Sequence, residues 1–245
     1  MTIRNKIVAI TGAGRGIGRA TALHLAAHGA RLVLGARSEP ELVAVVNEIE
    51  AAGGEAVFRG MDVSRRADLE ALVALACERH GRLDVIVNNA GIGPISRFDA
   101  LRVEDWDAMI DINLRGALYG IAAALPVFER QQKGHVVNIL STAGIKIVPT
   151  MGVYAATKNA LRTATEALRQ EAGPHLRVTE VSPGFIDTSF ADASITDPEV
   201  KAAIQRRKDE LAIPPDAIAR AIAFAIEQPD DVEIGSIVVR PTAQD

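Results

Sequence analysis

The sequence predicts an α/β fold in which one mostly parallel sheet carries helices on both faces. Three observations support this prediction. Short apolar runs alternate with longer helical patterns along the chain, as in successive βαβ units. A glycine-rich turn separates the first apolar run from the first helical pattern. The chain has 245 residues, 48% of them hydrophobic, which is enough to bury one large core. We therefore expect one doubly wound domain over residues 1–245.

The first expected strand, Lys6–Thr11, is an apolar run that leads into the glycine-rich turn. Backbone N–H groups at the start of the next helix make such a turn an anion site, suited to the phosphates of a dinucleotide. The glycines fit T-G-x-x-x-G-x-G, through Gly12, Gly16 and Gly18, rather than the common G-x-G-x-x-G. No Gly-Lys-Ser/Thr follows, which excludes a nucleoside-triphosphate P-loop. A purely structural turn is the alternative.

The second expected strand, Arg31–Ala36, ends where a dinucleotide fold meets the adenosine ribose. An acidic residue there would hold the ribose 2′-hydroxyl, but this chain has Arg37. A guanidinium pairs with a 2′-phosphate through two hydrogen bonds, and Arg15 in the glycine turn is placed to approach the same phosphate. These arginines favour NADP(H). The alternative is that Arg37 is a solvated loop residue and that Glu39 or Glu41 binds the ribose.

Another βαβ step follows. The pattern at Glu41–Ala52 is helical, and Ala56–Val63 is the third expected strand. Asp62, near the end of this strand, offers an acceptor for an adenine amino group. The amphipathic pattern at Ala67–His80 predicts the next helix.

The fourth expected strand, Leu83–Val87, runs into Asn88-Asn89-Ala90-Gly91. These residues suit a close approach of the backbone to a ligand, although a plain turn uses them too. One long helical pattern then covers Val103 to about Arg130 and includes Asn113, a weak helix former for which a surface position is the ordinary interpretation. The fifth strand, Gly134–Ser141, ends at the edge of the sheet where ligands bind in such folds.

Tyr154 and Lys158 lie four residues apart in a helical pattern that continues to about Glu171. They therefore share one face of the helix, one turn apart. A phenol titrates near pH ~10, and a neighbouring ammonium group lowers that pKa by favouring the phenolate. A shift of ~3 units requires roughly 4 kcal/mol, which a second positive charge such as an oxidised nicotinamide ring would help to supply. Taken alone, an ordinary surface pair is the alternative interpretation.

The sixth expected strand is Leu176–Ser182, and residues 185–213 after it are expected to form a substrate lid. Asp197 followed by Pro198 predicts an N-cap and the first position of a helix within this lid. A mere connecting segment is the alternative. An amphipathic helix over residues 216–227 and a last strand over residues 235–239 complete a set of seven strands.

Taken in chain order, these motifs resemble those of a classical short-chain dehydrogenase/reductase. The matching motifs are Thr11-Gly12 to Gly18, Asn88-Asn89-Ala90-Gly91, Asn113, Ser141, Tyr154 with Lys158, and Pro183-Gly184 with Thr188. The resemblance covers Lys6 to about Thr188 and implies a Rossmann-type fold with a mostly parallel seven-stranded sheet. The ending, Arg240 to Asp245, lacks the Asp-Gly-Gly of fatty-acid-synthesis ketoreductases, which puts an acyl-carrier-protein substrate in doubt.

The resemblance implies four catalytic residues. Tyr154 would be the general acid in carbonyl reduction and the base in alcohol oxidation. Ser141 would hydrogen-bond the substrate oxygen. Lys158 would hold the nicotinamide ribose and lower the pKa of Tyr154. Asn113 would fix a water that links Lys158 to solvent.

The same resemblance implies the binding residues and the activity. The cofactor-binding set is Gly12, Arg15, Gly16, Ile17, Gly18, Arg37, Asp62, Val63, Asn89, Ala90, Gly91, Tyr154, Lys158, Pro183, Gly184, Ile186 and Thr188. The substrate set is Ser141, Ile147, Met151, Tyr154 and Phe185. For Ile147, Met151 and Phe185, a place in the core is the alternative. We expect an NADP(H)-dependent oxidoreductase that interconverts a carbonyl and an alcohol on a small or medium, largely apolar substrate. A non-catalytic NADP(H)-binding sensor or scaffold is the alternative.

Composition argues against other classes. A formal charge of −4 without a basic run argues against nucleic acid, and no apolar run of ~18 residues predicts a membrane span. Cys77 is the only cysteine, and no signal-peptide pattern precedes the first strand, which suits a cytoplasmic protein. His24 and His28 alone do not make a zinc site, and no Gly-x-Ser-x-Gly elbow is present. Apolar helices over residues 110–128 and 161–168 suggest a homodimer or homotetramer.

Overall fold

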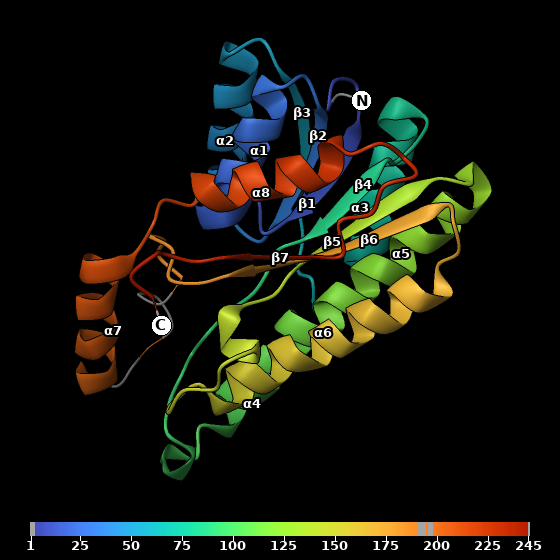
Figure 1. Ribbon diagram of the computed structural model, residues 1–245. Helices are drawn as coiled ribbons and strands as arrows, with labels where there is room; N and C mark the ends of the chain where they lie inside the picture. Colours follow the sequence, from blue (N-terminus) through green and yellow to red (C-terminus); the bar gives the residue numbers. More distant parts are fainter. Residues whose placement is uncertain (1–2, 191–194, 196–197, 245) are drawn as a thin grey trace.

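A computed structural model describes residues 3–190, 195 and 198–244. Its sheet has seven parallel strands in the order β3-β2-β1-β4-β5-β6-β7 (Figure 1). The strands are β1 (Ile7–Thr11), β2 (Arg31–Ala36), β3 (Glu55–Gly60), β4 (Val85–Asn88), β5 (Gly134–Ile139), β6 (Leu176–Pro183) and β7 (Ser236–Val239). The predicted doubly wound α/β fold is confirmed. Strand order reverses between β1 and β4, and the crevice at the carboxyl ends of these two strands is where such sheets bind ligands.

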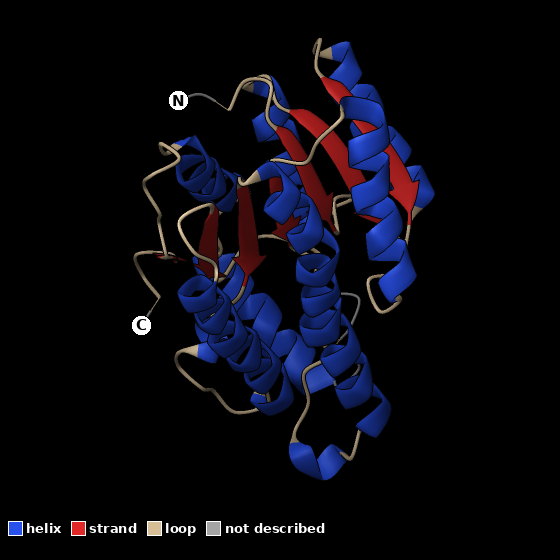
Figure 2. Ribbon diagram, turned by 90° about the vertical axis from the view of Figure 1, so that its right-hand side faces the viewer, coloured by secondary structure: helices blue, strands red, loops and turns tan. Residues whose placement is uncertain are grey.

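Helices cover both faces of the sheet (Figures 1 and 2). In chain order they are α1 (Gly16–Ala27), α2 (Glu39–Ala51), α3 (Arg66–His80), α4 (Val103–Met109), the π-helical segment η2 (Ile110–Arg115), α5 (Gly116–Gln131), α6 (Gly152–Glu171), α7 (Pro198–Leu211) and α8 (Asp216–Glu227). Short 3₁₀ turns lie at Phe98–Ala100 (η1) and Thr142–Gly144 (η3).

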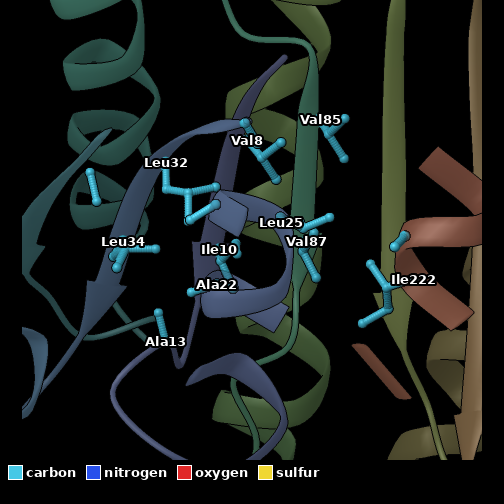
Figure 3. Packing of buried hydrophobic residues seen from close by; sticks show 14 of the residues in the cluster. Val8, Ile10, Ala13, Ala22, Leu25, Leu32, Leu34, Val85, Val87 and Ile222 are labelled. Carbon is cyan, nitrogen blue, oxygen red and sulfur yellow. The ribbon is translucent and has the colours of Figure 1, made fainter. Parts of the chain in front are cut away.

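Alternation along each strand builds the two halves of the core. Successive side chains of a strand point to opposite faces of the sheet. Val8 and Ile10 of β1 therefore pack with α1, α2 and α8, as Figure 3 shows with Leu25 of α1 and Ile222 of α8. Ala9 belongs to the other cluster, which α3 and α5 cover. Both clusters are buried, so the strands read as continuous apolar runs, as expected for a parallel sheet.

Several boundaries differ from the expected ones by a few residues, and the differences at β3, at β5 and in the long helix bear on the site. β3 ends at Gly60 and β5 ends at Ile139, so that Asp62 and Ser141 lie in the loops just beyond their strands. The long helix expected over residues 103–130 is continuous but contains the π-helical turn η2. Helix α7 begins at Pro198 as expected, whereas its expected N-cap, Asp197, lies outside the described residues.

The helical stretch Val103–Gln131 is the one part of the described chain that is long and apolar enough to cross a membrane by length and composition. An 18-residue window in it has a mean hydropathy of 1.2. A core helix of a soluble protein meets the same test, and this stretch packs Ile121, Ala124 and Phe128 into the core beside α3.

Candidate active site

The glycine turn after β1 is tied to the end of β4 by one hydroxyl and one amide. Thr11 Oγ1 accepts hydrogen bonds from the backbone N–H groups of Asn89 (3.0 Å) and Ala90 (3.1 Å). The Asn89 side chain donates in return to the carbonyl oxygens of Thr11 (2.8 Å) and Gly12 (3.2 Å). The first and fourth strands therefore hold the turn in one conformation at the topological switch point.

Two glycines in this turn are required by geometry. Gly12 has a φ of +67°, which L side chains rarely adopt. At Gly18 a β-carbon would lie 2.2 Å from the carbonyl oxygen of Gly12, so no side chain fits between helix α1 and the strand end. Arg15 is the extended, exposed N-cap residue of α1, and Ile17 packs against the core behind it. The bare N–H groups at the start of α1 form an anion site of the expected kind.

A cavity opens beside this turn, between the ends of β2, β3 and β4. Arg37, Asp62, Val63, Ala90 and Gly91 all line it, and all five belong to the predicted cofactor set. The Asp62 carboxylate accepts hydrogen bonds from the backbone N–H and the hydroxyl of a neighbouring serine through Oδ1. These residues come from loops far apart in the sequence, and the sheet brings them to one edge.

Acidic side chains stand close to this region as well. A β-carbon at Gly14 would lie 2.9 Å from Glu41 Oε2, and one at Gly60 would lie 2.3 Å from Glu39 Oε1. Arg37 is exposed and precedes both of these glutamates in the sequence. Arg37, which would bind a 2′-phosphate, and the two glutamates, either of which would instead bind the ribose, therefore all stand in this region.

Asn113 is buried in the π-helical turn η2. Its side chain accepts from the N–H of Ile92 (2.8 Å) and donates to the carbonyl of Ile92 (2.9 Å) and to Thr157 Oγ1 (3.2 Å). The interpretation of Asn113 as a surface residue is therefore wrong. The wider π turn lets this amide pair with the segment after β4 and with helix α6 together, and such turns are frequent at functional sites.

Lys158 is 4% exposed and reaches across to the end of β5. Its Nζ donates to the carbonyl oxygen of Ile139 at 2.8 Å and lies 6.0 Å from the centroid of the Tyr154 ring. A β-carbon at Gly91 would lie 3.6 Å from the same Nζ, so the absence of a side chain there keeps the backbone close to the ammonium group. Burial lowers the pKa of Lys158 to about 8.

Tyr154 stands in the first turn of α6, beside Ser141 at the end of β5. Burial raises the pKa of Tyr154 to about 12, and a hydrogen bond with Ser141 acts in the opposite direction. The spacing of Tyr154 and Lys158 predicts that the ammonium group lowers this pKa. The chain by itself shows the opposite direction, because the ammonium group lies beyond hydrogen-bond reach of the phenol ring while desolvation acts on the phenol directly.

The segment after β6 lies over the glycine turn. A β-carbon at Gly16 would lie 3.2 Å from Thr188 Cγ2, so Thr188 touches the turn directly. Ile186 forms an isolated β-bridge with Ile213, which joins the two ends of the segment expected to form a lid. Pro183 is the last residue of β6, and the N–H of Gly184 donates to Val239 of β7 at 2.8 Å.

Only some of the predicted substrate residues lie close to Tyr154. Met151 immediately precedes helix α6, close to Tyr154 in the chain. Ile147 is 75% exposed, so it lies on the rim rather than in the interior. The Phe185 ring carries the guanidinium of Arg207 at 5.5 Å from its centroid and so faces helix α7.

Two residues of the site carry no motif and escape sequence reasoning. The Phe190 ring meets the Tyr154 ring edge to face, with centroids 5.8 Å apart. Gln244 accepts from the N–H of Phe185 at 2.9 Å through Oε1 and donates to Thr142 Oγ1 at 3.3 Å through Nε2. Its amide thus joins the start of the lid to the residue after Ser141. Both contacts arise only from the tertiary fold.

These residues fit a bound dinucleotide. The cradle has an anion site at the start of α1, a cavity at the ends of the neighbouring strands, and an ammonium group facing Gly91. Within the described residues, no group of three or more His, Cys, Asp or Glu side chains is placed to hold a metal ion.

Comparison with known proteins agrees with this geometry. Residues 6–199 match the sequence model of the family described as short chain dehydrogenase. A protein of Listeria monocytogenes named as an uncharacterised oxidoreductase is 46% identical over 247 residues, which cover 100% of this chain and 99% of that protein.

Solved structures extend the comparison. The alcohol dehydrogenase of the archaeon Thermococcus sibiricus, complexed with 5-hydroxy-NADP, is 32% identical with a TM-score of 0.88, and 99% of each chain is covered. A short chain dehydrogenase/reductase of Burkholderia phymatum, in complex with NAD, is 28% identical with a TM-score of 0.87, covering 97% of this chain and 90% of that one. Similar chains therefore bind either nicotinamide cofactor.

Proposed function

The chain belongs to the short-chain dehydrogenase family, and on that premise we propose that it is an NADP(H)-dependent oxidoreductase that interconverts a carbonyl and a secondary or primary alcohol. The observation that carries the proposal is the convergence of Ser141, Tyr154 and Lys158 at the carboxyl ends of the strands, beside Gly91. When bound, the nicotinamide supplies or accepts the hydride, which no side chain can do.

The side chains then have separate tasks. In carbonyl reduction Tyr154 donates the phenol proton to the substrate oxygen, and the raised pKa keeps that proton in place at neutral pH. The Ser141 hydroxyl donates a hydrogen bond to the same oxygen and stabilises the charge that develops there. In alcohol oxidation Tyr154 must instead lose its proton, so this direction needs positive charge nearby that lowers the pKa of Tyr154.

Cofactor binding uses the surrounding residues. The start of α1, with Gly12, Gly16 and Gly18, would hold the pyrophosphate, and Lys158 would hydrogen-bond the nicotinamide ribose. Asn113 keeps the segment after β4 against α6, which supports a positioning role beside the expected water link. Arg37 and Arg15 support NADP(H) over NAD(H), since both are exposed cations at the ribose end of the crevice.

The substrate is proposed to be a small or medium, largely apolar carbonyl compound. Phe190 packs against Tyr154, and the exposed Ile147 and Ile145 stand on the loop that precedes helix α6. An apolar ring against the proton donor favours an apolar group next to the carbonyl. We also propose that the protein works in the cytoplasm as a homodimer or homotetramer.

The deciding experiment follows absorbance loss of NADPH, and separately of NADH, with a panel of ketones and aldehydes. Tyr154→Phe is the matched variant, because it removes one oxygen and leaves the ring. We expect NADPH-preferring turnover that falls by at least about 100-fold in the variant, since general acid catalysis contributes about 10²–10⁴-fold. NADPH binding should persist in the variant. Turnover that survives in Tyr154→Phe would contradict the mechanism, and binding without any turnover would favour a sensor or scaffold.

A further inference from the structure

A second cavity lies at the opposite edge of the sheet from the crevice. Lys6 directly precedes β1, His135 stands at the start of β5, and Arg177 stands at the start of β6. Because all strands are parallel, these positions meet at the amino-terminal edge (Figure 1). They line a cavity of about 200 Å³, with Asp84, Gln132, Lys133, Gly134, Pro174, His175 and Asp230.

The carboxylates that line this cavity already have partners, so they are not free to pair with all of its positive groups. Asp84 accepts from the backbone N–H of Ile7 at 2.7 Å and pairs with an exposed arginine at 3.0 Å. Asp230 pairs with Lys133 at 2.5 Å. Both acidic groups of the cavity are therefore already engaged.

Two positive groups of the cavity, Lys6 and Arg177, pair with no carboxylate among the described residues. Lys6 is half-buried, and no hydrogen bond or ion pair to its ammonium group is present within residues 3–190, 195 and 198–244. Arg177 is 7% exposed and donates to the carbonyl oxygens of Ala225 (3.1 Å), Ile226 (3.3 Å) and Gln228 (3.3 Å), which are neutral acceptors. Burial lowers the pKa of Lys6, and the nearby Arg177 lowers it further, while Asp230 and Asp84 act in the other direction.

His135 lines the same cavity and has one buried acceptor atom without a partner. It is 1% exposed, and its Nε2 lies 2.8 Å from Thr179 Oγ1. The single hydroxyl hydrogen of Thr179 is donated to the carbonyl oxygen of Ile234 at 2.7 Å, so Thr179 must accept from His135 Nε2–H. Burial lowers the pKa of His135 well below its usual value, which keeps the ring neutral. Its Nδ1 is therefore a bare lone pair, and this buried atom has no hydrogen-bond partner.

We propose that this cavity binds a small oxyanion that carries a hydroxyl hydrogen, of which hydrogenphosphate is the simplest. Its charged oxygens would pair with Lys6 and Arg177, and its hydroxyl group would donate to His135 Nδ1. The site lies at the opposite end of β5 and β6 from Ser141 and Pro183. It is therefore separate from the phosphate-binding turn at α1, and the proposal stands whether or not the proposed oxidoreductase activity is correct.

The test is calorimetric titration of the full chain with potassium phosphate at pH 8, where the phosphate keeps one hydroxyl group. NADPH is present at saturation, so that the anion site at α1 is filled, and chloride is matched in ionic strength. We expect one saturable site per chain. Sulfate, which has no hydroxyl hydrogen, should bind about tenfold more weakly, because one hydrogen bond contributes about 0.5–1.5 kcal/mol.

Variants locate the site. Lys6→Gln should weaken phosphate binding by at least about tenfold, since a hydrogen bond to a charged group contributes about 1.5–3 kcal/mol. Lys6→Arg keeps the charge and should keep binding within a few-fold, and Lys201→Gln, an exposed lysine on α7, should match the wild type. The proposal is overturned by absence of saturable phosphate binding in the wild type, by equal binding in Lys6→Gln, or by sulfate binding as tightly as phosphate.

Discussion

At the residue scale, the proposed preference for NADP(H) rests on Arg37. Arg37 lines the cavity at the end of β2, while Glu39 and Glu41 supply the competing carboxylates nearby. If Arg37 pairs with the 2′-phosphate, Arg37→Ala should lower kcat/KM with NADPH by about 10–100-fold, as expected for hydrogen bonds of about 1.5–3 kcal/mol to a charged group. The kcat/KM with NADH should change less than about twofold. Steady-state rates with both cofactors measure this.

A control on the same strand sharpens this prediction. Arg31 stands at the other end of β2 and pairs with Glu55 at 3.0 Å, away from the cavity. Arg31→Ala should therefore leave the cofactor preference unchanged. An equal loss with NADPH and NADH in Arg37→Ala would show that the residue supports the fold rather than the 2′-phosphate.

Lys158 makes stability depend on pH in a defined direction. Its pKa is lowered from 10.5 to about 8 by burial, so the unfolded chain binds the proton more tightly than the folded chain. The penalty is full below pH 8 and disappears as the pH rises above 10.5, where the lysine is neutral in both states. A shift of this size corresponds to about 3 kcal/mol.

Lys158→Met removes this pH-dependent penalty on folding. Between about pH 8 and 10.5 the free energy of unfolding of the wild type should rise by about 3 kcal/mol relative to that of the variant. Urea unfolding of both proteins at several pH values across that range measures the difference. A difference that is the same at every pH would mean that the folded chain does not disfavour the ammonium form.

Prediction from sequence reaches a limit at single residues. Tyr154, Lys158, Ser141 and the glycines stand out because their spacing is local, and the parallel sheet brings them together at one edge. The direction of the Tyr154 pKa could not be predicted in this way, because it depends on burial by side chains from other elements.

Helices and strands could also be predicted only in part. All seven strands stand out, because buried parallel strands are continuous apolar runs between turn residues. The π-helical turn at Ile110–Arg115 does not, since one turn of altered pitch hardly changes the hydrophobic pattern of a long helix. The contact of Gln244 with Thr142 spans 102 positions and carries no local signal.

Gln244 gives a prediction at the scale of elements. Its amide joins the lid segment at Phe185 to the 3₁₀ turn at Thr142, next to Ser141. Gln244→Ala removes two neutral hydrogen bonds of about 0.5–1.5 kcal/mol each, so kcat/KM for the carbonyl substrate should fall by about tenfold. The dissociation constant for NADPH should change less, because the glycine turn is untouched.

Matched variants separate this role from a general loss of packing. Gln244→Glu keeps an acceptor for the N–H of Phe185 and should lose less activity than Gln244→Ala. Gln170→Ala, an exposed glutamine bonded only to Glu166 among the described residues, should behave like the wild type. A kcat/KM in Gln244→Ala equal to that of the wild type would show that the two hydrogen bonds of Gln244 do not affect turnover.

At the scale of the whole molecule, the helical stretch of α4, η2 and α5 exposes several apolar side chains. Val103, Ile110 and Leu118 are all exposed there, on the helical stretch that also has the length and hydropathy of a membrane span. Another copy of the chain can cover exposed apolar side chains of this kind and remove them from water. The homo-oligomer proposed above would therefore use this face.

Leu118→Glu tests that arrangement. A carboxylate in a covered apolar interface is strongly unfavourable, so the variant should dissociate to the monomer at micromolar concentration, whereas the wild type should have the mass of a dimer or tetramer in light scattering. Val43→Glu is the control, because Val43 is exposed to a similar extent (40% against 38%) but lies on α2, over the other face of the sheet. A wild-type monomer would refute the oligomer. Equal masses for an oligomeric wild type and Leu118→Glu would place its interface elsewhere, and dissociation in both variants would mean that added charge, rather than this face, controls assembly.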